Sequence, residues 1–267
     1  HPYKLADWCA PYGYDSAQQY FETSTAYYYY GLCIMAQTAG VLGRKEDEKR
    51  YSDLAAKVKE VFLAKYYDAE NHCYGTQTLT SFCAELGLYP EGEKAAMADW
   101  CARDIVSHDY HVTCGHLGLR YIYKFMSEFG YYEVLDKTLN SRTYPSFGAQ
   151  IEMGATTLWE SFTLSTHRQS LNHPFKGAFS LWLYEDVLGI KKTSPGYKTF
   201  AVKPVVTPIV PWAKGEVQTV YGKIAVDYKV GSHFLVTVPA NTTAEVYVPQ
   251  EDGSFLRHTL KSGSYSL

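Results

Sequence analysis

Hydrophobic and polar positions in the first two thirds of the chain recur at helical spacing, and two kinds of segment alternate. Residues 22–42 are apolar almost all round and nearly without charge, which predicts a helix buried on both sides. Residues 45–65 carry their charges on one face, which predicts a half-exposed helix. The later apolar segments are 76–88, 114–130 and 174–190, and the amphipathic segments between them are 92–106 and 131–141.

This alternation, with a pair of helices about every 40 residues, predicts antiparallel hairpins with an inner apolar and an outer amphipathic member. An α/α toroid arranges hairpins in this way, and an ordinary helical bundle is the alternative. Only about four inner helices are present where a six-hairpin barrel needs six, so we expect an incomplete toroid. Several apolar segments end in a glycine suited to the left-handed C′ position: Gly43, Gly87, Gly130 and Gly189.

From about residue 197 onward, apolar and polar residues alternate one by one, with Gly, Pro and Asn between the runs. This pattern predicts β-strands, because successive side chains of a strand point to opposite faces. Pro195-Gly196 marks the boundary. The predicted fold is mainly α and then β: residues 1–195 form the incomplete α/α toroid of helical hairpins, and residues 196–267 form a small antiparallel β-sandwich.

Composition argues against several classes of function. The 267 residues carry a formal net charge of -3 without a cluster of Lys or Arg, so we expect no binding to nucleic acid or to a membrane. No apolar run reaches the roughly 18 residues of a membrane helix, and residues 1–11 lack the apolar core of a signal peptide. A chain that opens on His1-Pro2 is expected to be a processed protein or a fragment of a longer one.

All six cysteines lie in the first half of the chain and form no CxxC pair, which argues against a structural zinc site. Cys33, Cys83 and Cys101 fall on apolar helix faces, where free thiols act as small core residues. Unpaired thiols favour the cytoplasm, and a periplasmic or extracellular location stays open. His111 and His116 are spaced poorly for two ligands on one helix face, so we expect no metal and no cofactor.

Loops that enter the inner helices of a toroid gather at one end of its axis, and several of these loops are aromatic and polar. Such a ring suits a carbohydrate, because aromatic faces pack on sugar C–H groups while carboxylates and histidines bind hydroxyls. The stretch GATTLWESF holds one carboxylate, Glu160. A purely structural interpretation is also open, with Glu160 in the first turn of a helix and Asp7 in a turn or cap. Trp8, Trp159 and His173 would then be core or turn residues.

Five stretches follow one another over nearly the whole chain: ADW near the start, GATTLWESF, SLNHPFKGAFSLWLYEDVLGI, PGYKTFAVKP and VPANTTAEVYVP. In this combination they resemble the bacterial α-L-rhamnosidases of glycoside hydrolase family seventy-eight. The resemblance implies an (α/α)6 barrel followed by a β-sandwich. It also implies removal of terminal α-L-rhamnose from glycosides or polysaccharides, with inversion at the anomeric carbon.

The resemblance also implies roles for individual residues. Glu160 falls on the general base, and His173 falls on a ligand of the sugar hydroxyls. Trp8 falls on a stacking wall for the rhamnose, with Asp7 beside it, and Trp159 belongs to the same substrate-binding set. Ala6 stands where the family usually has Gly.

Inversion needs a second carboxyl group, a general acid about 6.5–9.5 Å from the base. In the family this acid lies on an acidic stretch with Arg and Trp well before the ADW-like element, and no such stretch is present. Asp15, Glu22 and Glu152 stand in other contexts. We therefore expect a C-terminal portion of the catalytic barrel plus the sandwich, inactive alone, with the acid upstream. An open half-barrel is expected to expose apolar faces and to pair with another chain, including a second copy.

Two other functions stay open. A non-catalytic carbohydrate-binding or assembly module would use the same aromatic loops without cleaving a bond, and an activity assay separates it from a hydrolase. Another α/α-toroid enzyme, such as a phosphorylase, would need an Arg or Lys pocket for phosphate, and the loops contain little of either.

Overall fold

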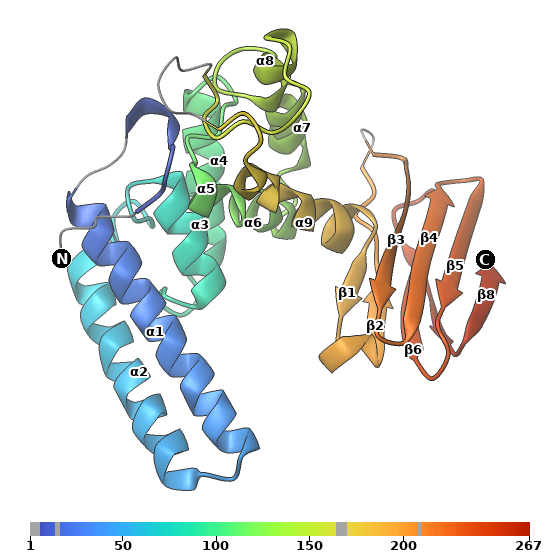
Figure 1. The fold of residues 1–267 in the computed structure, drawn as a ribbon, viewed down its shortest axis with the longest axis horizontal. Coiled ribbons are helices and arrows are strands. Elements are labelled where there is room, and N and C mark those ends of the chain that lie inside the picture. The colour runs from blue at the N-terminus through green and yellow to red at the C-terminus, as the bar shows by residue number, and fades with distance from the viewer. Residues whose placement is uncertain (1–5, 14–16, 164–169, 208–209) are drawn as a thin grey trace. The chain divides into compact units, whose positions relative to one another are not determined.

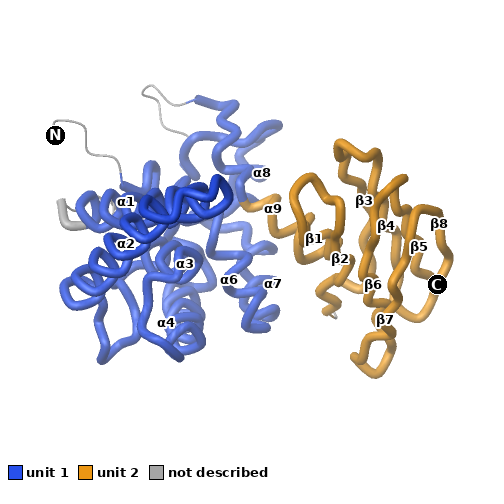
Figure 2. The backbone as a smooth tube through the Cα atoms, turned by 90° about the horizontal axis from the view of Figure 1, so that it is seen from below, with its two compact units in different colours: residues 1–178 blue, residues 179–267 orange. Residues whose placement is uncertain are grey.

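The computed structural model describes residues 6–13, 17–163, 170–207 and 210–267. The chain divides into two compact units, residues 1–178 and residues 179–267 (Figure 2). This division lies earlier than the expected boundary at residue 195. The segment before that boundary belongs with the strands, because Ile190–Lys192 forms the first of them and the Tyr228 hydroxyl donates to the Val187 carbonyl at 2.9 Å.

The first unit consists of helical hairpins, as expected (Figure 1). Its helices are α1 (Ala17–Val41), α2 (Lys45–Tyr66), α3 (Gln77–Leu86), α4 (Lys94–Ser107), α5 (His116–Leu119), α6 (Ile122–Glu128), α7 (Tyr132–Asn140) and α8 (Phe147–Glu152), with a 3-10 turn η1 at Pro11–Gly13. The expected single helix over residues 114–130 is divided into α5 and α6, and α8 was not expected. Every residue from Gln77 to Ala84 of α3 is buried, so α3 lies in the core of this unit.

The prediction that the helix over residues 22–42 is buried on both sides is wrong for the described structure. Helix α1 packs against α2 and α3, and it leaves large apolar side chains exposed, with Phe21 at 68% and Tyr28 at 53%. An apolar run predicts that a helix face is buried, but it does not identify the segment that covers that face. No helix among the described residues is both long enough and apolar enough to cross a membrane.

The predicted left-handed glycines are confirmed. Gly43, Gly87, Gly130 and Gly189 have φ angles of 72, 75, 77 and 76°. At the end of α3, the N–H of Leu88 donates to the Cys83 carbonyl at 2.9 Å, which satisfies one of the last carbonyls of the helix.

An irregular helical segment links the two units and is followed by two four-stranded sheets. The helical segment consists of η2 (Pro174–Phe179), α9 (Ser180–Trp182) and the π-helical η3 (Leu183–Val187). The strands are β1 (Ile190–Lys192), β2 (Thr199–Val202), β3 (Trp212–Thr219), β4 (Gly222–Lys229), β5 (His233–Val238), β6 (Thr243–Pro249), β7 (Phe255–Leu260) and β8 (Gly263–Ser266). The sheet orders are β1-β2-β6-β7 and β3-β4-β5-β8.

The strand pairing is antiparallel as predicted, with one exception. Strands β2 and β6 run parallel, because the chain leaves the first sheet after β2, forms β3 to β5 in the other sheet, and returns at β6. The alternate residues of β6, namely Ala244, Val246 and Val248, are buried. The one-by-one alternation in the sequence therefore identified which face of the strand is inward.

Candidate active site

Glu160 lies on a loop and not in a helix. The segment from Leu158 to Glu160 runs beside the segment from Ser170 to His173. The N–H of Glu160 donates to the Ser170 carbonyl at 2.9 Å, and the N–H of His173 donates to the Leu158 carbonyl at 2.7 Å. The interpretation of Glu160 as an acid in the first turn of a helix is therefore wrong, and His173 is held close to Glu160 by main-chain hydrogen bonds.

Both oxygens of the Glu160 carboxylate accept a hydrogen bond, one from a distant residue and one from the neighbouring segment. The indole N–H of Trp8 donates to Oε1 at 2.8 Å, and the N–H of Ser170 donates to Oε2 at 2.9 Å. The bond from Ser170, followed by that from Trp8, lowers the pKa of Glu160 below its usual range. A carboxylate can accept about four hydrogen bonds. The charged form of the Glu160 carboxylate is thus favoured, and its oxygens can accept further hydrogen bonds.

His116, at the start of α5, holds the main chain at Glu160. Its Nε2 lies 2.9 Å from the Glu160 carbonyl oxygen, and burial lowers the pKa of this imidazole. A neutral ring that donates its Nε2–H to the carbonyl fits both observations. The His116 ring is also 4.8 Å from the ring of His173 and stacks at 5.9 Å on Phe175. Trp8 and Phe175 are exposed, at 49% and 65%, so aromatic faces are accessible beside the carboxylate.

Asp7 anchors the loop that carries Trp8. It is 5% exposed, and its carboxylate accepts hydrogen bonds from the main-chain N–H groups of Gly115 at 2.6 Å and Leu117 at 2.9 Å. The Gly118 N–H at 3.3 Å and the Thr78 hydroxyl complete this set. These bonds oppose the effect of burial, which raises the pKa of Asp7. The carboxylate is therefore occupied in joining its loop to α3 and to the start of α5.

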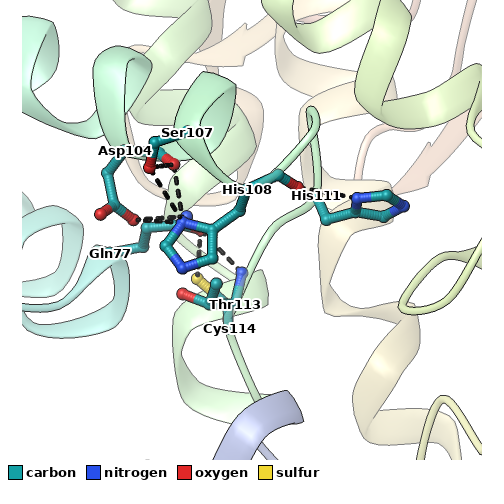
Figure 3. Close-up of polar contacts among 7 residues, drawn as sticks. All are labelled: Gln77, Asp104, Ser107, His108, His111, Thr113 and Cys114. Carbon is teal, nitrogen blue, oxygen red and sulfur yellow. Dashed lines mark hydrogen bonds and ion pairs between the residues drawn. The ribbon is translucent and has the colours of Figure 1, made fainter.

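Gln77, the first residue of α3, fixes the loop that leads into α5 (Figure 3). Its amide nitrogen donates to Asp104 Oδ2 at 2.8 Å, and its amide oxygen accepts from the main-chain N–H of Thr113 at 2.8 Å. The Cys114 thiol lies 3.9 Å from the same oxygen. Gln77 is completely buried, so both ends of its amide have the partners that a buried polar group requires. The loop that ends at His116 is thereby fixed to α3 and α4.

The structure brings some predicted site residues together and buries others. Trp8, Glu160 and His173 form one cluster. Trp159, at 5% exposure, and Asp7 are buried, so neither offers a free face to a sugar, contrary to their expected role as substrate ligands. Sequence reasoning missed Ser170, His116 and Phe175; His116 was weighed only as a metal ligand, although its loop was recognised as polar and aromatic.

The carboxylates considered for the general acid lie elsewhere. Glu22 is 3% exposed in α1, and Glu152, at the end of α8, is paired with Arg142. Asp15 lies outside the described residues.

Within the described ranges, no group of three or more His, Cys, Asp or Glu side chains is arranged to hold a metal ion. His111 is 6% exposed, and its ring nitrogens lie 2.8 Å from the His108 carbonyl and 2.9 Å from the Thr143 hydroxyl. A cavity of about 710 Å³ lies in the second unit, at the β4–β5 and β6–β7 turns, and none of the predicted site residues lines it.

Helical hairpins followed by a β-sandwich, with a carboxylate among exposed aromatic rings on the helical unit, suit a carbohydrate-active class of protein. The comparisons agree. The bacterial alpha-L-rhamnosidase six-hairpin glycosidase domain matches residues 1–187, and the bacterial alpha-L-rhamnosidase C-terminal domain matches residues 189–262. The chain therefore belongs to the bacterial alpha-L-rhamnosidase six-hairpin glycosidase family.

Individual relatives show the same likeness. An alpha-L-rhamnosidase of Formosa agariphila is 30% identical over 96% of this chain and 30% of its own length. The structure of an alpha-L-rhamnosidase from Dictyoglumus thermophilum superposes with a TM-score of 0.90 at 30% identity, over 99% of this chain and 33% of that one. The Streptomyces avermitilis alpha-L-rhamnosidase complexed with L-rhamnose gives 0.87 at 26% identity, over 98% and 28%. The chain thus spans about a third or less of these relatives.

Proposed function

We propose that the chain provides the water-activating side of an inverting α-L-rhamnosidase site, which removes terminal α-L-rhamnose from glycosides or polysaccharides. The observation that supports this most is the Glu160 carboxylate, held ionised by Trp8 and Ser170 beside exposed aromatic faces. A general base must be ionised at the working pH to take a proton from water. The relatives named above are alpha-L-rhamnosidases, which supports the same substrate class.

The other residues of the cluster bind and position in this proposal. Trp8 forms the wall on which the apolar face of the sugar packs, and the ring of His173 bonds a sugar hydroxyl. Asp7 and Trp159 act from the buried side and hold their neighbours Trp8 and Glu160. We assign none of the described carboxylates as general acid, and an acid supplied from outside these 267 residues stays our expectation.

The test is Glu160→Gln in the protein that carries this chain. Because the amide cannot take a proton from water, turnover of an aryl α-L-rhamnoside should fall by about 10²–10⁴-fold, while L-rhamnose binding is retained. With the wild-type protein, proton NMR of the rhamnose first released should show the β-anomer, as inversion requires.

Glu152→Gln is the matched control. It makes the same change at the end of α8, where the carboxylate is paired with Arg142. It should leave turnover near the wild-type level. Near-normal turnover in the Glu160→Gln protein would overturn the assignment of the base. Rhamnose binding without any turnover in the wild-type protein would instead favour the non-catalytic binding module.

A further inference from the structure

Lys176 is a buried lysine beside the candidate active site, and the proposed mechanism does not use it. It lies in η2, three residues after His173, and is 0% exposed. Among the described residues its ammonium nitrogen has no hydrogen-bond partner. Nζ lies 3.7 Å from the centre of the ring of Phe162, a buried residue that follows Glu160 by two positions.

Packing and stability do not explain a lysine at this position. A buried ammonium group without a hydrogen-bond partner is costly, and an apolar side chain of similar length would fill the same space without that cost. Groups whose burial costs stability gather at functional sites. The position beside Glu160, and not the core as such, is therefore the feature that calls for an explanation.

Charged and titratable groups of the Asp7–Trp8 loop and of the loop into α5 act on the Lys176 ammonium group. Burial lowers its pKa to about 8, while the thiols of Cys9 and Cys114 and the carboxylate of Asp7 oppose that decrease. His116 is affected in turn, because the charge of Lys176 adds to the effect of burial in lowering the pKa of His116. Lys176 thus interacts with the loop of Asp7, with the loop into α5 and with the loop of Glu160.

We propose that Lys176 is a positioning residue for Glu160: its ammonium group holds the ring of Phe162, and with it the Glu160 loop, against the loop that carries Asp7 and Trp8. A cation over an aromatic face in a site without water is strongly attracted to the ring. The hydrogen bond from Trp8 to Glu160 forms where these two loops meet. The consequence for hydrolysis rests on the proposed function, whereas the positioning itself does not.

This arrangement makes the site sensitive to alkaline pH. Because the pKa of Lys176 is about 8, it loses its proton at a lower pH than an exposed lysine does. The neutral amine is no longer attracted to the ring or to Asp7. The hydrogen bond between the Trp8 indole and Glu160 should therefore loosen above about pH 8, and the activity should fall on the alkaline side.

The experiment is a ¹H–¹⁵N NMR titration of the Trp8 indole N–H in the full chain between pH 6 and pH 10, with the signal assigned from Trp8→Phe. All proteins carry Cys9→Ser, so that the thiol of the Asp7–Trp8 loop does not contribute to the titration. In this background the indole signal should shift with a midpoint somewhat below about pH 8, because the Cys9 thiol, which opposes the decrease in the Lys176 pKa, is gone. Lys176→Met should abolish that shift, and it should fold because it removes a buried charge.

A second variant tests the proposal even if Lys176→Met folds poorly, and a control variant accompanies it. Phe162→Leu removes the aromatic face that favours the ammonium form, so the midpoint should fall by about 0.5–1.5 pH units. Lys65→Met is the matched control: this exposed lysine also lies over an aromatic ring, 5.1 Å from that of Tyr66, and its loss should leave the titration unchanged.

A Trp8 signal that does not move between pH 6 and pH 10, one that still titrates in Lys176→Met, or a midpoint unaffected by Phe162→Leu would each overturn the proposal. The alkaline limb of hydrolysis in the protein that carries this chain provides the functional readout, and Lys176→Met should remove the decrease near pH 8. If the protein neither binds nor hydrolyses rhamnosides while the indole titration behaves as described, the proposed function fails and the role of Lys176 stands.

Discussion

At the scale of the residue, the candidate site contains two ionisable groups controlled by opposite effects. Hydrogen bonds from Ser170 and Trp8 favour the charged form of Glu160 and lower its pKa. Burial disfavours the charged form of Lys176 and also lowers its pKa. Glu160 is therefore ionised well below neutral pH, while Lys176 keeps its proton at neutral pH and loses it in mildly alkaline solution. The two effects together predict a range of pH in which both groups are charged.

Trp8→Phe tests the acidic side of this range. The substitution removes the indole N–H that donates to Glu160 and keeps an aromatic face for the sugar. Loss of a donor to the charged form raises the pKa of Glu160, so the acidic limb of the pH–rate profile should move to higher pH. Activity should therefore decrease more at acidic than at neutral pH when an aryl α-L-rhamnoside is hydrolysed.

Trp212→Phe is the control for this measurement, because Trp212 is 62% exposed on β3 in the other unit. Its pH–rate profile should match that of the wild-type protein. An acidic limb that stays in place in Trp8→Phe would show that this hydrogen bond does not control the ionisation of Glu160.

At the scale of the element, the short helix α5 joins the parts of the site. Its N-cap and first turn supply the N–H groups that bind Asp7, and its first residue is His116, which bonds the Glu160 carbonyl. The N–H of His116 also donates to the Trp8 carbonyl at 2.9 Å. Four residues of helix thus connect the Asp7–Trp8 loop to the Glu160 loop, and Gly115 lies directly against the main chain of Trp8 and Ala10.

Gly115→Ala tests this close approach. A Cβ atom at Gly115 would lie 2.3 Å from the Trp8 carbonyl oxygen and 2.7 Å from the Ala10 nitrogen, and both are main-chain atoms that cannot turn aside. The loop must therefore move, at a cost of about 1–3 kcal/mol in the free energy of unfolding. Denaturant unfolding gives this cost, and the Trp8 indole NMR signal reports the displacement.

Gly31→Ala is the matched control, since nothing lies within 4 Å of a Cβ at this exposed position in α1. Alanine favours a helix more than glycine does, so this variant should be more stable by about 0.5–1 kcal/mol. Equal stability changes of the same sign in both variants would contradict the close approach at Gly115.

At the scale of the whole molecule, the exposed face of α1 is the largest departure from the sequence expectation. Phe21, Tyr28 and Met35 follow one another at intervals of seven residues, so they share one face of the helix, and they are 68%, 53% and 45% exposed. Exposed apolar surface of this kind promotes association. The isolated chain is therefore expected to self-associate through α1.

Replacing Phe21, Tyr28 and Met35 together by Gln should shift the chain toward monomer in sedimentation velocity, without lowering its melting temperature. The control replaces three exposed apolar residues from other parts of the chain, Val61, Trp212 and Val220, and should change the distribution little. If the control is as effective as the α1 variant, the association does not depend on this face.

Much of the fold could be predicted because its signals are local. The helices at 45–65 and 92–106, the glycine C′ positions and the change to strands near residue 197 each depend on residues close together in the sequence. The parallel pairing of β2 with β6 could not be predicted, because it joins segments about 40 residues apart whose alternation is the same for either direction. The break between α5 and α6 likewise left no clear signal in the apolar run.

The sequence pointed to the central residues of the candidate site and not to their partners. Glu160 and Trp8 could be identified because the resemblance assigned them roles, and the structure joins them by a hydrogen bond. The same reasoning placed Asp7 and Trp159 on the sugar, since a sequence motif does not distinguish a residue that contacts a ligand from its buried neighbour. Lys176 lay within the quoted motif SLNHPFKGAF but gave no signal, because its chemistry comes from burial against Phe162.

The sequence by itself determined the order of the elements, the change from helices to strands and the family, because periodicity and motifs are properties of neighbouring residues. Only the tertiary structure decided which side chains meet. The indole of Trp8 reaches a carboxylate 152 positions away, and the ammonium group of Lys176 lies on the ring of Phe162 without a hydrogen-bond partner among the described residues. The hydrogen bonds and burial that set the pKa values of Glu160 and Lys176 exist only after these distant segments pack together.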